Sequence, residues 1–225
     1  MQQNERVIQL IKEQKYEQAA ELLNEIIEEN PQDPIGYINF GNLLLQTNNY
    51  EQAEAFFHKA IEHDNEAATA YYGLGNVFYE TENFPEAQKY YELAIKYGLE
   101  ESDVFFMLGL TFVQQELVKL SLPYLLRAVE LDDADAEKWF QYGLSLAQAD
   151  HITEAKNIFE RVLTLNETHS DAHYNLGVIA FHYKKFTKAV NHFDRALQLN
   201  QEHILAANGK KQVEKWLAEQ NENEG

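Results

Sequence analysis

Near the C-terminal end of the 225-residue chain, three residues have the types and spacing that a metal site could use: His169, Asp171 and His173 form an H-x-D-x-H pattern. Imidazole nitrogens and carboxylate oxygens both bind divalent metals. His173, however, stands at a position that other parts of the chain fill with Tyr, Phe or Trp, and His169 lies in the turn before it. The two imidazoles need not share a helix face. The pattern therefore favours packing and solvent exposure, and we expect no metal site.

Catalytic side chains of other kinds are equally hard to place. The chain has no cysteine, which excludes disulfides, thiolate metal ligands and cysteine nucleophiles. The remaining histidines show no ligand spacing, and no nucleophile motif is present. Carboxylates are numerous, but no pair stands in an apolar setting that would shift its pKa. The sequence therefore predicts a protein that is not an enzyme and has no cofactor.

The charge balance restricts the class of partner. The chain carries 37 acidic and 18 basic residues, a net charge of −19. Nucleic acids and anionic membrane surfaces are disfavoured, because both bind proteins through Lys and Arg. The acidity either serves solubility alone or indicates a preference for neutral or basic partners. No apolar run has the length of a signal peptide or a membrane span, so we expect a cytoplasmic protein.

The elements that would carry any site follow from an internal repeat. Five glycines recur at intervals of 34 residues, namely Gly41, Gly75, Gly109, Gly143 and Gly177. Small residues follow twelve positions later at Ala53, Ala87, Ser121, Ala155 and Ala189, and the position seven further on is Ala in four units and Val162 in the fifth. Each unit contains two amphipathic stretches with helical spacing, separated by turn-forming residues. Glycine inside a helix costs roughly 0.5–1 kcal/mol relative to alanine, so we interpret these glycines as sites of close helix packing. A phosphate-binding glycine would instead follow a strand, and no strand pattern exists.

This repeat resembles the tetratricopeptide repeat (TPR) family, which has a 34-residue helix–turn–helix unit. The third unit matches the family pattern with Tyr71, Leu74, Gly75, Phe78, Ala87, Tyr91 and Ala94. The resemblance implies an all-α fold, a right-handed superhelical α-solenoid of about six TPR units with a C-terminal capping helix. We expect one solenoid over residues 1–217, with repeats at 1–33, 34–67, 68–101, 102–135, 136–169 and 170–203, a capping helix at 204–217 and a flexible acidic tail at 218–225.

One unit departs from the pattern. The stretch "QQELVKLSLPYLL" lacks a good turn, and Pro123 stands where the second helix of repeat 102–135 should be under way. We expect that helix to start late or to kink.

The resemblance also implies where a ligand would bind. In TPR proteins the first helices line the concave side, and the second, fifth, sixth, ninth, twelfth and thirteenth residues of each repeat face the ligand. Leu45 and Gln46 fall at such positions, and our candidate peptide-binding residues are Asn39, Asn42, Tyr72, Asn76, Tyr79, Glu80, Asp103, Phe106, Met107, Phe140, Gln141, Tyr174, Asn175 and Phe181. Rings interleaved with amides suit an extended peptide, because the amides offer a donor and an acceptor to its backbone. The alternative is that these residues are family defaults and that neighbouring helices cover part of each ring.

The candidate positions contain no Lys or Arg, unlike the TPR co-chaperones that clamp acidic C-terminal tails. The sequence therefore predicts a non-catalytic interaction adaptor or scaffold that holds an extended, neutral or basic peptide in its concave groove. We expect a monomer rather than an oligomer. The alternative is an assembly module that binds a folded partner or itself through convex or end surfaces. The segment "ILAA" at residues 204–207 would suit self-association if the capping helix covers it imperfectly.

Overall fold

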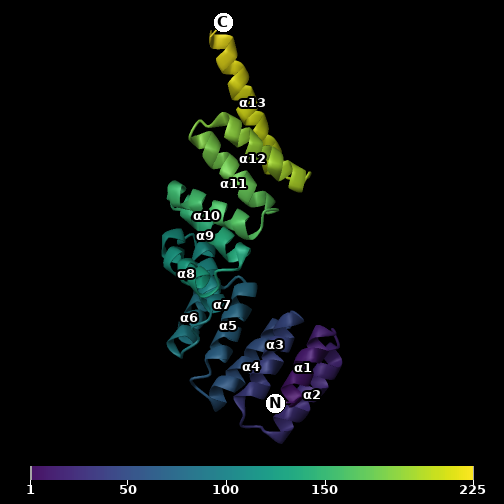
Figure 1. Cartoon of the computed structure of the whole chain (residues 1–225). Coiled ribbons are helices and arrows are strands. Elements are labelled where there is room, and N and C mark those ends of the chain that lie inside the picture. Colours follow the sequence, from purple (N-terminus) through teal and green to yellow (C-terminus); the bar gives the residue numbers. More distant parts are fainter. Residues whose placement is uncertain (1, 225) are drawn as a thin grey trace. The chain divides into compact units, whose positions relative to one another are not determined.

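The computed structural model describes residues 2–224, with side chains from 3 to 219, and within this part the chain forms thirteen helices and no strand (Figure 1). In chain order they are α1 (Gln2–Lys12), α2 (Tyr16–Glu29), α3 (Pro34–Gln46), α4 (Tyr50–His63), α5 (Ala68–Glu80), α6 (Phe84–Lys96), α7 (Ser102–Gln114), α8 (Val118–Leu131), α9 (Ala136–Gln148), α10 (Ile152–Leu165), α11 (Ser170–His182), α12 (Phe186–Leu199) and α13 (Ile204–Glu224). The helices α3, α5, α7, α9 and α11 begin at the first residue of a predicted repeat, and α13 begins at the first residue of the predicted capping helix. The expected all-α repeat solenoid is confirmed. None of these helices is long and apolar enough to cross a membrane.

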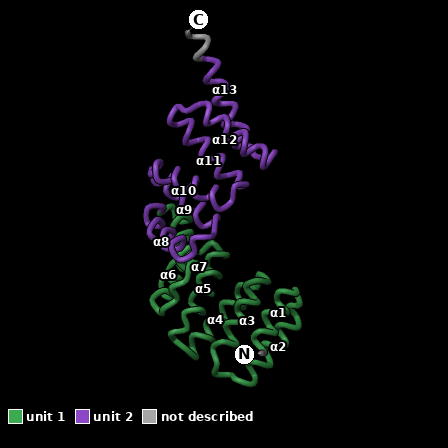
Figure 2. The backbone as a smooth tube through the Cα atoms, viewed as in Figure 1, with its two compact units in different colours: residues 1–117 green, residues 118–225 purple. Residues whose placement is uncertain are grey.

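The chain divides into two compact units, Met1–Leu117 and Val118–Gly225 (Figure 2). The first contains α1–α7 and the second contains α8–α13. The boundary falls between α7 and α8, inside the predicted repeat 102–135. Within each unit the two helices of a repeat pack on each other, as α3 packs on α4 and α11 on α12, and each second helix packs on the first helix of the next repeat, as α4 packs on α5 and α10 on α11.

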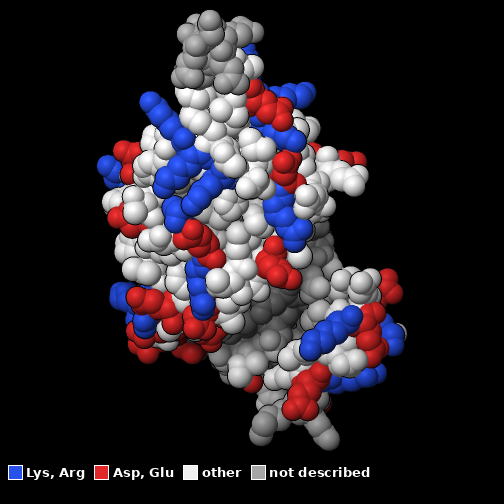
Figure 3. Space-filling view, turned by 45° about the horizontal axis from the view of Figure 1, so that its top comes forward, with Lys and Arg blue, Asp and Glu red and all other residues white. Residues whose placement is uncertain are grey.

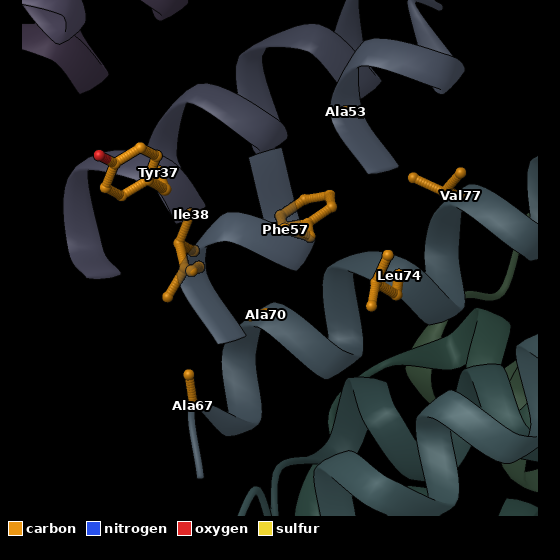
Figure 4. Close-up of a cluster of buried hydrophobic side chains, with 9 residues drawn as sticks. Tyr37, Ile38, Ala53, Phe57, Ala67, Ala70, Leu74 and Val77 are labelled. Atoms are coloured by element: carbon orange, nitrogen blue, oxygen red, sulfur yellow. The ribbon is translucent and has the colours of Figure 1, made fainter. Parts of the chain in front are cut away.

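An aromatic ring from a second helix forms the centre of four helix pairs, while α8 has Leu125 at that position. In the first unit, Phe57 of α4 is fully buried between α3 and α5, among Ile38, Leu74 and Val77 (Figure 4). A Cβ atom added to Gly41 would lie 2.7 Å from this ring. The same clash would arise between Gly75 and Tyr91, Gly143 and Phe159, and Gly177 and Phe193. These four glycines therefore make room for a ring, which confirms their packing role.

The first repeat fills its core with a different pair of residues at the glycine and ring positions. Val7 stands at the glycine position, and the ring position holds Leu23. Both are buried, at 1% and 0% exposure, in one cluster. A larger residue at the first position thus accompanies a smaller one at the second.

The turn inside each repeat is the same throughout. Its left-handed residue has a φ between 56° and 67° and is never glycine; the six are Gln14, Asn48, Glu82, Glu116, Asp150 and Lys184. The N–H of Glu82 donates to the carbonyl of Tyr79, and the N–H of Asn83 donates to that of Phe78. This is the Schellman pattern of helix termination. Asn83 stands at the N-cap of α6, but its side chain makes no capping bond.

The expectation for the departing repeat is wrong in part. Glu116 and Leu117 make the same two backbone bonds, and α8 begins at Val118, in phase with the other second helices. It therefore does not start late, and Pro123 stands inside it. The expected kink stays a prediction, because a proline inside a helix loses the backbone bond to the residue four positions earlier and its ring crowds that carbonyl.

The last helix extends past its expected end. Residues 204–217 were expected as the capping helix, and α13 continues as helical backbone to Glu224. The flexibility of the acidic segment 218–225 stays a prediction, and Gly225 and the side chains of 220–224 lie outside the described part.

Candidate functional site

The H-x-D-x-H residues do not converge. The Nδ1 atom of His169 accepts the N–H of Ala172 at 3.2 Å and so caps α11. Asp171 lies 3.2 Å from the Nε2 atom of His203. The Nδ1 atom of His173 is 3.2 Å from that of His192. The three side chains thus have three different partners, and no group of three or more His, Asp or Glu in the described part is arranged to hold a metal.

The predicted ligand-facing residues of the first unit line an open depression on the side of the first helices. Its volume is about 420 Å³, and it is lined by Leu45, Gln46, Asn48, Tyr50, Tyr72, Asn76, Glu80 and Met107. Six of these eight stand at positions that the resemblance marked as ligand-facing. They come from α3, α5 and α7, the first helices of three successive repeats.

Two lining residues were missed from the sequence. Asn48 is the left-handed residue of its turn, and Tyr50 begins α4. The Tyr50 hydroxyl donates to the Asn48 Oδ1 atom at 3.0 Å. The stretch "TNNY" contains the sequence signal for these two residues. Its left-handed turn directly follows α3 and brings the residues around it close to the C-terminal end of that helix.

Asn76 has a structural bond as well as a place in the depression. Its Oδ1 atom accepts the hydroxyl of Tyr91 at 2.8 Å. Tyr91 is fully buried, and burial raises the pKa of its phenol, so the hydroxyl stays protonated. Asn76 is therefore half-buried and bonded to a core residue as well as lining the depression.

The other candidates of the first unit lie outside this lining. Asn42 is exposed on α3, and Asn39 is half-buried, with its Nδ2 atom 3.4 Å from the Asn4 Oδ1 atom. Tyr79 is half-buried and meets Phe84 edge to face at 5.6 Å between ring centroids. Asp103 is exposed and Phe106 is half-buried.

In the second unit, one candidate belongs to the core. Phe140 is only 7% exposed and packs against Phe159 and His169, with centroids 5.7 and 4.5 Å away. The alternative stated from the sequence holds for this ring, because α10 and the turn before α11 cover it.

The remaining candidates there are half-buried and already engaged. The Gln141 Nε2 atom donates to the Glu137 Oε1 atom at 2.7 Å, and the Asn175 Nδ2 atom donates to the Asp171 carbonyl at 2.8 Å. Tyr174 packs on Phe193 and His203, and Phe181 packs on Phe186. Neighbouring residues thus cover part of the surface of each of these two rings.

The comparisons with known proteins agree on the family. Tetratricopeptide repeat models match residues 10–59, 38–96, 72–136, 136–169 and 170–203. No curated protein matches the chain.

Among solved structures, YrrB, described as a TPR protein with an unusual peptide-binding site, is 45% identical; the match covers 85% of this chain and 99% of YrrB with a TM-score of 0.79. The protein pilF of Pseudomonas aeruginosa matches with 15% identity and a TM-score of 0.80, over 92% of this chain and 95% of its own. A MamA protein matches with 15% identity and a TM-score of 0.69, over 75% and 92% of the two chains. The last two show the fold alone. The family models and the YrrB match together show that this chain belongs to the tetratricopeptide repeat family of protein-interaction modules.

Proposed function

We propose that the protein is a non-catalytic adaptor that binds an extended, neutral or basic peptide segment across α3, α5 and α7. The observation that carries this proposal is the depression of the first unit, in which ligand-facing residues of three successive repeats gather. A peptide crossing the three helices would meet the same type of surface at each step.

The chemistry of the lining suits a peptide backbone. Leu45, Tyr72 and Met107 provide apolar area, while Gln46 and Asn76 provide amide groups that bond to backbone N–H and C=O. Aromatic side chains lose little conformational freedom when they bind, and Met side chains adapt their shape to different ligands. This combination favours contact with the backbone over recognition of one fixed sequence.

The charge of the lining supports the choice of ligand. Glu80 is its one ionised side chain, and it is exposed. A basic side chain of the ligand would gain from this carboxylate, while an acidic one would be repelled. The 45% identical YrrB is described as having a peptide-binding site, which supports the same class of ligand.

Selection of displayed random peptides tests the proposal. The wild type is compared with Tyr72→Ala/Met107→Ala, which removes apolar contacts from the lining. The control is Leu120→Ala/Leu126→Ala, which removes two exposed apolar side chains of α8 in the second unit. We expect neutral or basic peptides to be enriched on the wild type and the control, and to bind the first variant about tenfold more weakly. Enrichment of acidic peptides that the Tyr72→Ala/Met107→Ala variant binds more weakly, or equal binding of the selected peptides to all three proteins, would contradict the proposal.

A second candidate function has its own observation. Ile204 and Leu205, at the start of α13, are 73% and 58% exposed, which is unusual for two adjacent aliphatic residues. This favours binding of a folded partner or a second copy at the C-terminal end. Light scattering across a concentration series distinguishes the two functions: a stable oligomer that Ile204→Ser/Leu205→Ser dissolves supports the end surface, and a monomer at all concentrations supports the peptide surface.

A further inference from the structure

The charge of this acidic protein is distributed unevenly. Residues 151–217 contain nine Lys and Arg against seven Asp and Glu, whereas residues 1–150 contain nine against 27. Figure 3 shows Lys and Arg side chains gathered on the surface nearer to the C-terminal end. Residues 218–225 add three Glu, so residues 151–225 are close to neutral as a whole, and nearly all of the net charge of −19 comes from residues 1–150.

Within this part, a cleft lined by lysines forms a local basic surface. It has a volume of about 220 Å³ and is built by α10, α11 and α12, with the lining Lys156, Glu160, Leu176, Ile179, Ala180, Tyr183, Lys185, Lys188 and His192. The three aliphatic residues from α11 are buried and form its base. Lys156 comes from α10, Lys188 from α12, and Lys185 from the turn directly before α12.

Two of these lysines have no acidic partner. Lys156 forms an ion pair with Glu160, at 2.7 Å between Nζ and Oε1. Among the described side chains, Lys185 and Lys188 make no ion pair, and Lys185 lies over the ring of Tyr183 at 5.8 Å. In a chain with twice as many acidic as basic residues, two adjacent unpaired ammonium groups beside an apolar base are a distinctive feature.

The basic surface continues along α12. A second depression, of about 390 Å³, shares Lys188 and His192 with the cleft and adds His173, Asn191 and Arg195. The Arg195 guanidinium donates to Gln198 and forms no ion pair within the described part. A ligand leaving the cleft along α12 would therefore meet a further cation.

We propose that this cleft binds an acidic peptide segment of a partner protein, with carboxylates on Lys185 and Lys188 and one aliphatic side chain on the base formed by α11. Charge complementarity selects the class of ligand, because the cleft is positive while most of the remaining surface repels carboxylates. The apolar base favours a peptide over a nucleic acid, because a peptide can place an aliphatic side chain on it. The cleft is separate from the depression on α3, α5 and α7 and has the opposite charge preference.

The test uses three labelled pentapeptides with blocked ends, measured by fluorescence anisotropy: Glu-Glu-Leu-Glu-Glu, its Gln-for-Glu counterpart and its Ser-for-Leu counterpart. We expect the first to bind, with affinity falling as NaCl rises from about 20 to about 300 mM. The Gln peptide should not bind measurably, and the Ser peptide should bind more weakly than the first.

The decisive variant is Lys185→Glu/Lys188→Glu. Its control is Lys211→Glu/Lys215→Glu, which changes the net charge equally at two exposed residues of α13. We expect the cleft variant to lose about tenfold or more in affinity and the control to change little, with both retaining the helical circular dichroism of the wild type. Equal losses in both variants, or competition by a single-stranded oligonucleotide as strong as by the unlabelled peptide, would overturn the proposal. A dimer that only the cleft variant dissociates would support it and identify a second copy as the source of the acidic segment.

Discussion

At the scale of single residues, the Asn76–Tyr91 hydrogen bond links the candidate site to the core. Asn76→Ala would leave a buried hydroxyl without its partner, at a cost of about 1–3 kcal/mol in the free energy of unfolding. Asn42→Ala, one repeat earlier on an exposed side chain, should cost little. Tyr91→Phe combined with Asn76→Ala should recover much of the loss, because neither polar group then remains. Urea unfolding of the four proteins measures this, and an Asn76→Ala protein as stable as wild type would contradict it.

The His173–His192 pair makes stability depend on pH. Burial lowers the pKa of both imidazoles, and neighbouring cations lower each pKa further. Glu160 acts in the opposite direction and raises the pKa of His192. Because the folded-state pKa values lie below the unfolded value of about 6.5, the unfolded chain binds more protons as the pH falls through that region. The contribution to stability is therefore complete above about pH 7 and is lost on acidification.

Replacing the pair tests this account. His173→Phe/His192→Phe uses residues found at the same repeat positions in Phe105 and Phe56. We expect the melting temperature to fall less between about pH 7.5 and pH 5.5 in this variant than in the wild type. His182→Gln, at an exposed position, should behave as the wild type does. An identical fall in all three proteins would refute the role of the pair.

At the scale of elements, the turns inside the repeats hold non-glycine residues at positive φ. Asn tolerates this conformation better than other residues with side chains, and only one of the six turns has it there. Glu82→Asn should therefore stabilise the protein by about 0.5–1 kcal/mol, and Asn48→Glu should destabilise it by a similar amount. Thermal unfolding of the two variants checks the opposed signs, and a shift in the same direction for both would show that the backbone conformation is not the cause.

The helix pairs predict a second effect. A Cβ on Gly143 would lie 2.9 Å from the ring of Phe159, so Gly143→Ala should cost about 1–3 kcal/mol through overpacking. Adding Phe159→Leu should offset part of that cost, since the first repeat combines Val7 with Leu23 in the same positions. If the double variant were no more stable than Gly143→Ala, the size match between these positions would not be what sets the helix spacing.

Much of the fold follows from the 34-residue period alone, including the first residue of α3, α5, α7, α9 and α11. The predicted late start of α8 was wrong because the prediction rested on the lack of typical turn-forming residues. The turn is closed by backbone hydrogen bonds, which Glu116 and Leu117 form as the residues of the other turns do. The site was predicted in part: repeat positions indicate which way a side chain faces, but not which neighbouring helix covers it, as Phe140 shows. The Asn76 bond had a sequence signal, because Tyr91 alone carries a hydroxyl where Phe57, Phe159 and Phe193 stand.

At the scale of the whole molecule, two surfaces differ in charge. The depression of the first unit contains one carboxylate and no cation, while the cleft of the second unit contains three lysines. Net charge alone predicted neutral or basic partners for the entire protein. Our two proposals instead give that preference to the first unit and the opposite one to the second.

The central claim, that the first-helix surface of the first unit binds a neutral or basic peptide, is tested most directly by a charge swap at Glu80. A selected basic peptide and its Lys-to-Glu counterpart are titrated calorimetrically against wild type, Glu80→Lys and the control Glu62→Lys, which changes an exposed residue of α4. We expect Glu80→Lys to weaken the basic peptide and strengthen the acidic one, each by about three- to tenfold at low salt, while Glu62→Lys leaves both nearly unchanged. Equal effects of the two substitutions, or none from Glu80→Lys, would contradict the claim.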